Sequence, residues 1–478
     1  MRAPGAANER RRSEAVEAAI RRGDLGPVLD KVLGGERLGL EDGARLYETA
    51  DLPGLGYLAN LVREAWWGDR ASFVRNLHLN PTNVCRFTCA FCAFGVRKDS
   101  ASAYEMDLAA VRDRLAPFRD ACLAEVHILS EARSGRRIAP EEALLLAVGA
   151  DFHDLAAAAR DARARRHPGR DVTYIVNTNI NYTNVCVTRC RFCSFYRLPG
   201  HDEGYVLDPA EVVRRALDAR ARGATQVLLQ GGHHPRLGIE HFEDLIRAVS
   251  ERTGLHLHAL SAPEVHHLAR IRRRPVGDVL RRLRAAGLDT LPGGGAEVLA
   301  DEARAAESPR KCTADEWIEV HRVAHGLGIR SSATMMFGLE EDRWRHRVDH
   351  LARLRALQDE TAGFTAFIAW TYQPRGNLAR PGERSAMTYL RLVALARLFL
   401  DNVGTIQASP LTQPPGVVQL ALDGGADDFG NVFLEEHVVA AAGVELRVTE
   451  ALARRTIAEA GYRPVRRDTY YRPQGEAA

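Results

Sequence analysis

Three cysteines, Cys186, Cys190 and Cys193, lie close together in the run NYTNVCVTRCRFCSFY and form a C-x3-C-x-aromatic-C pattern. They supply three thiolates, one fewer than a closed metal site requires. A 4Fe-4S cluster held by three cysteines leaves one iron open, and the amino and carboxylate groups of S-adenosylmethionine can chelate that iron. The spacing therefore predicts radical chemistry that begins when an electron reaches the sulfonium. A structural zinc site completed by His201 is the alternative, although zinc ribbons usually carry paired C-x2-C knuckles.

The same cysteine spacing occurs earlier in the chain, at Cys85, Cys89 and Cys92, in NPTNVCRFTCAFCAFG. The flanking residues agree as well, and GGERLGLEDGARL at 34–46 is similar to SGRRIAPEEALLL at 134–146. The chain therefore contains an internal duplication with a period of about 100 residues, which is too long for a solenoid repeat.

Composition narrows the possible partners and the location. The 478 residues include 46% hydrophobic residues and a net charge of +3 from 65 basic and 62 acidic residues. This balance predicts neither a nucleic-acid partner nor a charged membrane surface. The first residues lack the apolar centre of a signal peptide, and thiols kept for a cluster need a reducing compartment. We therefore expect a cytoplasmic protein.

After the second cysteine cluster, short apolar runs alternate with longer amphipathic patterns, which is typical of repeated βα units. The sequence predicts an α/β fold, a TIM-type (βα)8 barrel whose active face lies at the C-terminal ends of the strands. The expected strands cover 172–181, 226–230, 255–260, 289–292, 330–337, 363–371, 405–408 and 417–422. The expected helices cover 209–222, 242–252, 276–286, 314–327, 343–358 and 388–401.

Two glycine motifs follow expected strands. QGGHHP places Gly231 and Gly232 after the second strand, either as a tight turn or as a backbone that approaches the methionine part of the cofactor closely. PGGGAE follows the fourth strand, either as an ordinary turn or as a cofactor contact in which Glu297 meets a ribose hydroxyl or a cation; its glycines are Gly293, Gly294 and Gly295. The carboxylates Asp427 and Asp428 in GADDFGN are explained equally well by a solvated turn.

The stretch 138–443, with NINYTNVC, LLQGGHHPRLGIEHFEDL, LDTLPGGGAEVL and LQDETAGFTAFIAWTYQP, resembles the cyclic dehypoxanthine futalosine synthase family of radical SAM enzymes, which serve menaquinone biosynthesis. The front stretch 29–128, with LHLNPTNVCRFTCAFCAF, resembles the opening of aminofutalosine synthase. Only about 36 residues separate its last cysteine from residue 128, and a single βα unit already takes about 30.

We therefore expect a truncated duplicate at the front of the chain, whose cysteines are a possible second but vestigial cluster site. The expected organisation is a basic solvated tail over 1–28, the truncated segment over 29–128, a helical lead-in over 129–172, and the barrel with a C-terminal extension over 173–478.

The resemblance also implies a mechanism and a set of site residues. The cysteines of the second triad would bind the cluster, Phe192 and Tyr196 would shield it, and Gly231 and Gly232 would seat S-adenosylmethionine. The 5′-deoxyadenosyl radical would take hydrogen from the ribose C4′ of dehypoxanthine futalosine, and the carbon radical would attack the benzoate ring. An external donor such as flavodoxin or ferredoxin would supply the electron. The candidate bases for the last proton are His233, His234 and Glu297.

Some residues depart from the family pattern. Thr178 stands where the family has arginine, as does Leu77 in the front copy, and Pro410, Pro414 and Pro415 occupy a loop that usually holds a Ser-Trp-Val-Thr segment. Substrate positioning near Thr412 and Gln413 is therefore in doubt. Two alternatives stay open: another radical SAM enzyme, similar to aminofutalosine synthase or the deazaflavin-forming FO synthase, or a non-catalytic iron-sulfur protein.

Overall fold

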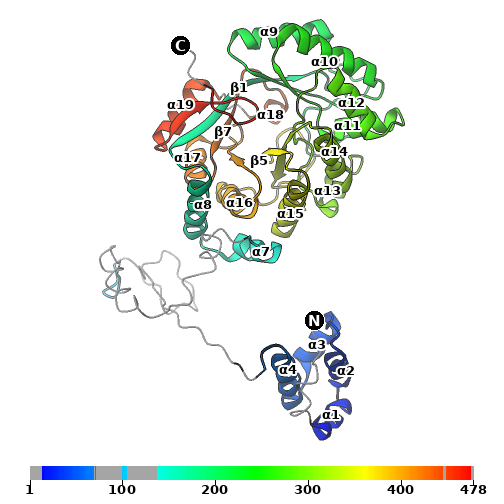
Figure 1. Cartoon of the computed structure of the whole chain (residues 1–478), viewed down its shortest axis with the longest axis vertical. Helices are drawn as coiled ribbons and strands as arrows, with labels where there is room; N and C mark the ends of the chain where they lie inside the picture. Colours follow the sequence, from blue (N-terminus) through cyan, green and yellow to red (C-terminus); the bar gives the residue numbers. More distant parts are fainter. Residues whose placement is uncertain (1–12, 69, 71–98, 105–136, 445–447, 475–478) are drawn as a thin grey trace. The chain divides into compact units, whose positions relative to one another are not determined.

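The computed structural model describes residues 13–68, 70, 99–104, 137–444 and 448–474. The chain divides into two compact units, Met1–Val126 and His127–Ala478 (Figure 1). The front triad of Cys85, Cys89 and Cys92 lies outside the described residues, as does Leu77.

The described part of the first unit is helical. Its helices are α1 (Glu14–Arg21), α2 (Gly26–Gly34), α3 (Leu40–Glu48) and α4 (Leu52–Trp67). Ile20, Leu25 and Val28 are buried against residues of α4 that include Leu58 and Leu61. The expectation of a solvated tail over 1–28 is therefore wrong from residue 13 onward, because the apolar stripe of α1 finds a partner in a small helical core.

The sequence duplication is also a repeat of structure. In the second unit, α7 (Pro140–Gly149) and α8 (Phe152–Arg166) correspond to α3 and α4. The Asp42 carboxylate accepts a hydrogen bond from the Gly39 N–H at 2.8 Å, and Glu142 accepts one from the Ala139 N–H at 2.7 Å. Such bonds satisfy a free N–H at a helix start, so both copies cap this helix in the same way.

The second unit is a parallel barrel. Its sheet follows the order β3-β2-β1-β7-β6-β5-β4, and β8 pairs with the first residues of β1. Residues 290 and 291 close the ring between β3 and β4: the Ala259 N–H donates to the Thr290 carbonyl, and the Leu291 N–H donates to the Arg330 carbonyl, both at 3.0 Å. The strands are β1 (Asp171–Asn181), β2 (Gln226–Gln230), β3 (His256–Ala259), β4 (Ser331–Phe337), β5 (Phe364–Thr371), β6 (Thr405–Gln407), β7 (Asp428–Phe433) and β8 (Arg463–Arg466).

Helices surround this barrel (Figure 1). Their apolar side chains are buried against it. The continuous apolar core lies between the two layers, as the βα periodicity predicts. The helices are α9 (Pro209–Ala221), α10 (Ile239–Thr253), α11 (Ala262–Ile271), α12 (Val276–Ala285), α13 (Asp301–Glu307), α14 (Ala314–Gly326), α15 (Trp344–Thr361), α16 (Ala386–Phe399), α17 (Pro415–Asp423), α18 (Val438–Ala441) and α19 (Glu450–Glu459).

The predicted eighth strand over 417–422 is wrong. This segment is α17, because Pro414 and Pro415 stand at its N-cap and first helical position, where proline favours a helix start. The strand at that place in the barrel is β7, which begins inside GADDFGN. Asp427 and Asp428 are therefore buried rather than in a solvated turn, and each carboxylate pairs with an arginine, Arg397 and Arg467 respectively.

Buried histidines make the barrel sensitive to acid. Burial lowers the pKa of His258 and of His350 to about 3. Above about pH 6.5 both histidines are neutral in the folded and in the unfolded chain. As the pH falls below this value, the unfolded chain takes up protons on these histidines while the folded chain does not, so the free energy of unfolding decreases. We expect about 1.4 kcal/mol less unfolding free energy per histidine at pH 5.5 than at pH 7.5, measured by urea denaturation of cluster-free protein.

Two single variants test this pH dependence. His350→Gln removes one buried imidazole, so its stability loss between pH 7.5 and 5.5 falls short of the wild-type loss by about 1.4 kcal/mol. His437→Gln changes a side chain that is 49% exposed and keeps the wild-type slope. Equal slopes in all three proteins would contradict the assignment.

Candidate functional site

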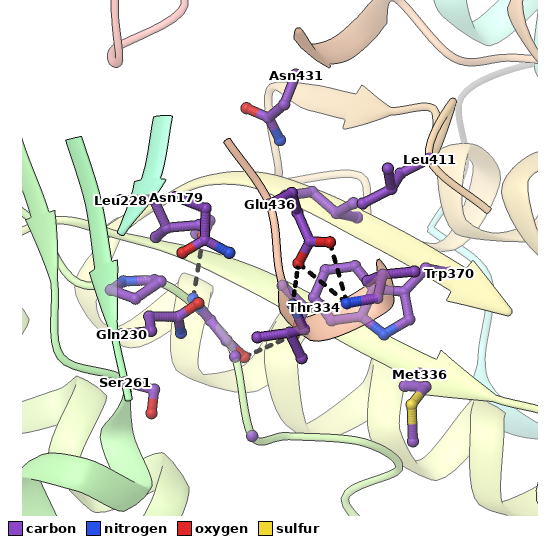
Figure 2. Close-up of a pocket in the computed structure, with 18 of the residues that line it drawn as sticks. Asn179, Leu228, Gln230, Ser261, Thr334, Met336, Trp370, Leu411, Asn431 and Glu436 are labelled. Atoms are coloured by element: carbon purple, nitrogen blue, oxygen red, sulfur yellow. Dashed lines mark hydrogen bonds between the residues drawn. The ribbon is translucent and has the colours of Figure 1, made fainter. Parts of the chain in front are cut away.

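The barrel encloses a cavity of about 390 Å³ that runs from the strand ends into the lumen (Figure 2). Inward side chains of the strands and the loops at their C-terminal ends form its wall. Most of the residues that the sequence singled out lie on this wall, namely Cys186, Cys190, Phe192, Cys193, Tyr196, Gly231, Gly232, His233, Gly293, Gly294, Gly295 and Glu297.

The cysteine loop begins five residues after β1 ends. The Cys186 N–H donates to the Arg197 carbonyl at 2.9 Å, and the Cys193 N–H donates to the Cys190 carbonyl at 3.2 Å. Arg189 turns the loop with a φ of 57°, a conformation that few side chains adopt. Burial raises the pKa of Cys190 to about 12 and also raises the pKa of Cys193. These thiols ionise readily only beside a positive charge, which bound iron provides.

The donor set fits a cluster with one open iron. Three cysteines line the cavity, and Cys312, the remaining cysteine in the described part of the chain, does not. His201, the alternative zinc ligand, does not line this cavity but an outer one, which Cys193 also lines. Within the described ranges, no three His, Cys, Asp or Glu side chains, the three cysteines included, converge closely enough to hold a single metal ion.

The glycines after β2 let two loops touch. A Cβ atom on Gly231 would lie 2.7 Å from the Tyr182 ring, and one on Gly232 would lie 2.4 Å from the Val185 carbonyl and 3.0 Å from the Cys186 Cβ. Any side chain at either position would force the loops apart. The close backbone approach therefore brings the second loop directly against the cysteine loop, and both glycines also face the cavity.

A buried carboxylate, which the sequence pattern did not indicate, joins these loops by hydrogen bonds. Glu264, 4% exposed at the start of α11, accepts hydrogen bonds from the Tyr182 hydroxyl at 2.7 Å and from the Gly231 N–H at 3.0 Å. Its other oxygen accepts a bond from the Ser261 N–H at 2.7 Å. A carboxylate with several donors stays satisfied although buried, so Glu264 ties three neighbouring strand ends together.

The glycine turn after residues 290–291 leads to an ion pair. Glu297 has a φ of 42°, and its Oε1 accepts a hydrogen bond from the Lys311 ammonium at 2.8 Å. The Arg304 guanidinium lies 3.6 Å from Oε2. Two cations therefore surround this carboxylate, and the Lys311 ammonium already occupies its Oε1. This geometry weighs against Glu297 as the base and favours its predicted contact with a cation.

Lys311 itself was not singled out from the sequence. Its side chain is 9% exposed, and the ammonium lies 5.3 Å from the centre of the Phe192 ring. Burial opposes its charge, but Glu297 and Cys190 outweigh that effect and raise the pKa of Lys311. A signal was present: the chain has only three lysines, Lys31, Lys98 and Lys311, among 65 basic residues.

The two histidines of QGGHHP have different surroundings. His233 lines the cavity, its Nδ1 lies 2.6 Å from the Thr188 hydroxyl, and its ring stacks on His267 at 5.0 Å. Burial lowers the pKa of His233 well below the ordinary value, so its imidazole is neutral. His234 does not line the cavity, because its Nδ1 accepts the N–H groups of Arg236 and Leu237 and closes a turn. The prediction of His234 as a catalytic base is therefore corrected.

The departures from the family pattern are accommodated locally. Thr178 alternates with the lumen-facing positions of β1, does not line the cavity and is buried on the helix side. The Gln413 amide donates to the Thr371 hydroxyl, and the Thr412 hydroxyl lies 2.8 Å from that of Ser409. Pro410 and Thr412 line the cavity, so the proline-containing loop forms part of its wall.

A closed parallel barrel with three cysteines of this spacing at its C-terminal rim defines a radical SAM enzyme. Residues 180–354 match the Radical SAM superfamily, and residues 361–477 match the CofH/MqnC C-terminal region. The chain is 45% identical to a cyclic dehypoxanthine futalosine synthase from Streptomyces coelicolor, over 72% of this chain and 87% of that one. It therefore belongs to the CofH/MqnC group of the radical SAM superfamily. Its cofactors are a 4Fe-4S cluster and S-adenosylmethionine.

Other relatives carry different activities. The chain is 38% identical to an aminodeoxyfutalosine synthase from Thermus thermophilus, over 73% of this chain and 95% of that one. Among solved structures, the methylornithine synthase PylB aligns with a TM-score of 0.56 at 18% identity, over 71% of this chain and 98% of that one. This likeness concerns the fold.

No helix within the described ranges is long and apolar enough to cross a membrane.

Proposed function

We propose that the protein converts dehypoxanthine futalosine to cyclic dehypoxanthine futalosine in menaquinone biosynthesis. The observation that carries the proposal is the enclosed lumen directly beneath the three cysteines, in a chain that spans 87% of a relative with this name. A radical formed at the rim needs its substrate held close by and shielded from water, and a closed barrel provides both.

The residues of the rim have different roles. Cys186, Cys190 and Cys193 hold the cluster, and when bound with S-adenosylmethionine it supplies the radical that abstracts hydrogen from the substrate. Phe192 and Tyr196 line the cavity beside the cysteines and exclude water. The backbone of Gly231 and Gly232 seats the methionine part of S-adenosylmethionine, and Gly293, Gly294 and Gly295 line the cavity where the rest of this cofactor lies.

The last step of ring closure removes one electron and one proton from the cyclised benzoate ring; the electron would return to the oxidised cluster, and a protein group must take the proton. Of the three bases expected from the sequence, His233 is the one that lines the cavity with a neutral imidazole. His233 presents an uncharged imidazole to the cavity, whereas Oε1 of Glu297 already accepts a hydrogen bond from Lys311. We therefore propose that His233 accepts this proton.

The electron comes from an external protein such as flavodoxin or ferredoxin in the cytoplasm. A second cavity on the outer side of the cysteine loop is lined by Cys193, Arg191 and Arg197. Because Cys193 lines both cavities, the cluster lies close to the surface here. Arg191 is exposed at this place and favours an acidic donor, whereas Arg197 is half-buried and paired with Glu203.

The test is an anaerobic assay of reconstituted protein with a strong reductant, S-adenosylmethionine and dehypoxanthine futalosine, followed by product mass spectrometry. The expected product is cyclic dehypoxanthine futalosine, with one 5′-deoxyadenosine per turnover. Consumption of tyrosine or of another nucleoside instead would favour a sister activity. Absence of any methionine release would favour a non-catalytic iron-sulfur protein.

A further inference from the structure

The lumen carries a row of carboxamides along β1. Asn177, Asn179 and Asn181 alternate along the strand and therefore face the same side, the cavity, with exposures of 1%, 5% and 2%. In the register of the sheet, Asn177 is opposite Gln226 and Asn181 is opposite Gln230, and both glutamines also line the cavity. Asn431 of β7 adds a carboxamide from the other neighbouring strand (Figure 2).

Burial of these amide side chains costs free energy, and some of their polar atoms have no hydrogen-bond partner. Asparagine is depleted in strands, and an amide buried without a partner loses its hydrogen bonds to water. The Asn177 amide donates to the Asn431 oxygen at 2.9 Å, and the Asn181 amide donates to the Gln230 carbonyl at 3.2 Å. The Oδ1 atoms of Asn177 and Asn181 have no hydrogen-bond partner, although both are buried. The row therefore retains hydrogen-bonding capacity for a ligand.

The wall across the lumen carries large apolar side chains. Strands β4 and β5 lie about half a turn of the barrel away from β1 and contribute Met336, Ile368 and Trp370 to the cavity. The same strands also contribute smaller hydroxyl side chains, those of Ser332, Thr334, Thr365 and Thr371. Figure 2 shows Asn179 and Gln230 on one side and Trp370 and Met336 on the other. The cavity thus has an amide wall, formed by the amide side chains of β7, β1 and β2, and an apolar wall with an indole.

The amide wall is uncharged, which restricts what it can bind. The two cationic side chains of the cavity other than histidine are already paired, Lys311 with Glu297 and Arg467 with Asp428. A phosphate would have to compete with a carboxylate for either cation. Neutral amides, which both donate and accept hydrogen bonds, match the hydroxyl groups of a sugar.

We propose that the amide wall binds the hydroxyl groups of an unphosphorylated sugar, with Asn179 at its centre, and that the apolar wall receives the aromatic ring of the same substrate. This inference rests on the proposed function, since it assigns the two halves of a substrate with a ribose and a benzoate ring. In this orientation of the substrate, the ribose lies near the cysteine rim at the end of β1, and the benzoate ring lies across the lumen. Both reacting carbons then lie inside the closed barrel.

Asn179→Leu is the test variant, because the structure gives the Asn179 side chain only one long hydrogen bond, from the Asn181 amide at 3.4 Å. Leucine has a similar size, so the fold should persist. Binding is measured by calorimetry on the cluster-loaded protein with S-adenosylmethionine and dehypoxanthine futalosine, without reductant. The matched control is Ile180→Val, since Ile180 is the next residue of β1 and is buried outside the cavity.

The expected result is a Kd for dehypoxanthine futalosine that is about tenfold weaker in Asn179→Leu, which corresponds to a lost hydrogen bond or two. The affinity for S-adenosylmethionine stays unchanged, and with reductant more 5′-deoxyadenosine forms per product because the ribose is misplaced. Asn179→Ser retains a donor and acceptor and restores part of the affinity. Ile180→Val binds the nucleoside as the wild type does.

The outcomes separate the two proposals. Unchanged affinity and unchanged product ratio in Asn179→Leu, with an active wild type, would overturn the amide wall alone. Binding that depends on Asn179 without formation of cyclic product would support the wall and overturn the proposed function. Failure of the wild type to bind the nucleoside would overturn both.

Discussion

Replacing Cys186 with alanine leaves the reconstituted protein without its iron-sulfur cluster and lowers product formation at least about a thousandfold. The remaining cysteines, Cys190 and Cys193, supply two thiolates, and two ligands do not hold a 4Fe-4S cluster with one open iron. Without it no electron reaches S-adenosylmethionine, so the radical step, and not merely substrate affinity, is lost. The measurements are iron and sulfide analysis, the visible absorption of the cluster, and 5′-deoxyadenosine formation.

The matched control is Cys312→Ala. Cys312 is as buried as Cys190, with exposures of 5% and 8%, but lies outside the cavity, so its variant should keep the wild-type iron content. Cys85→Ala should also keep it, since we expect one cluster per chain and about four irons. About eight irons in the wild type, falling to about four in Cys85→Ala, would show instead that the front triad holds a second cluster.

Replacing Arg467 with alanine should lower the free energy of unfolding by about 3–5 kcal/mol. Its side chain is 3% exposed and pairs with Asp428, which is fully buried, with one Nη2–Oδ1 distance of 3.0 Å. The same guanidinium donates to the Gln407 side chain at 3.2 Å and covers the Tyr471 ring at 3.7 Å. Removal of the cation leaves the carboxylate charged in a medium that solvates it poorly. Urea denaturation measures the loss.

Arg463→Ala is the control for this prediction. Arg463 belongs to β8, four residues earlier, and pairs with Asp171 through two hydrogen bonds of 2.6 Å. Both partners are exposed, at 72% and 43%, so water and salt screen the pair and its removal should cost far less than removal of Arg467. A similar loss in both variants would contradict the view that burial decides the value of these ion pairs.

The two arginines differ in burial, and the sequence pattern did not predict this difference. Alternating apolar runs predicted β1, β2, β4 and β5 within a few residues, because a strand buried on both faces has a local signature. The segment 417–422 is equally apolar and was predicted as a strand, yet Pro414 and Pro415 begin a helix there. The acidic GADDFGN showed no sign of burial, because its arginine partners come from α16 and from the C-terminal segment.

The class of chemistry and the three candidate cluster ligands follow from local sequence. Cys186, Cys190 and Cys193 lie within eight residues of each other, so their spacing is a property of one loop and can be read directly. The surroundings of these cysteines depend on how the whole barrel folds. The amide wall shared by Asn179 and Asn431 arises when the barrel closes and brings β1 and β7 side by side. Chain connectivity fixes the first kind of proximity, whereas burial of the apolar core fixes the second.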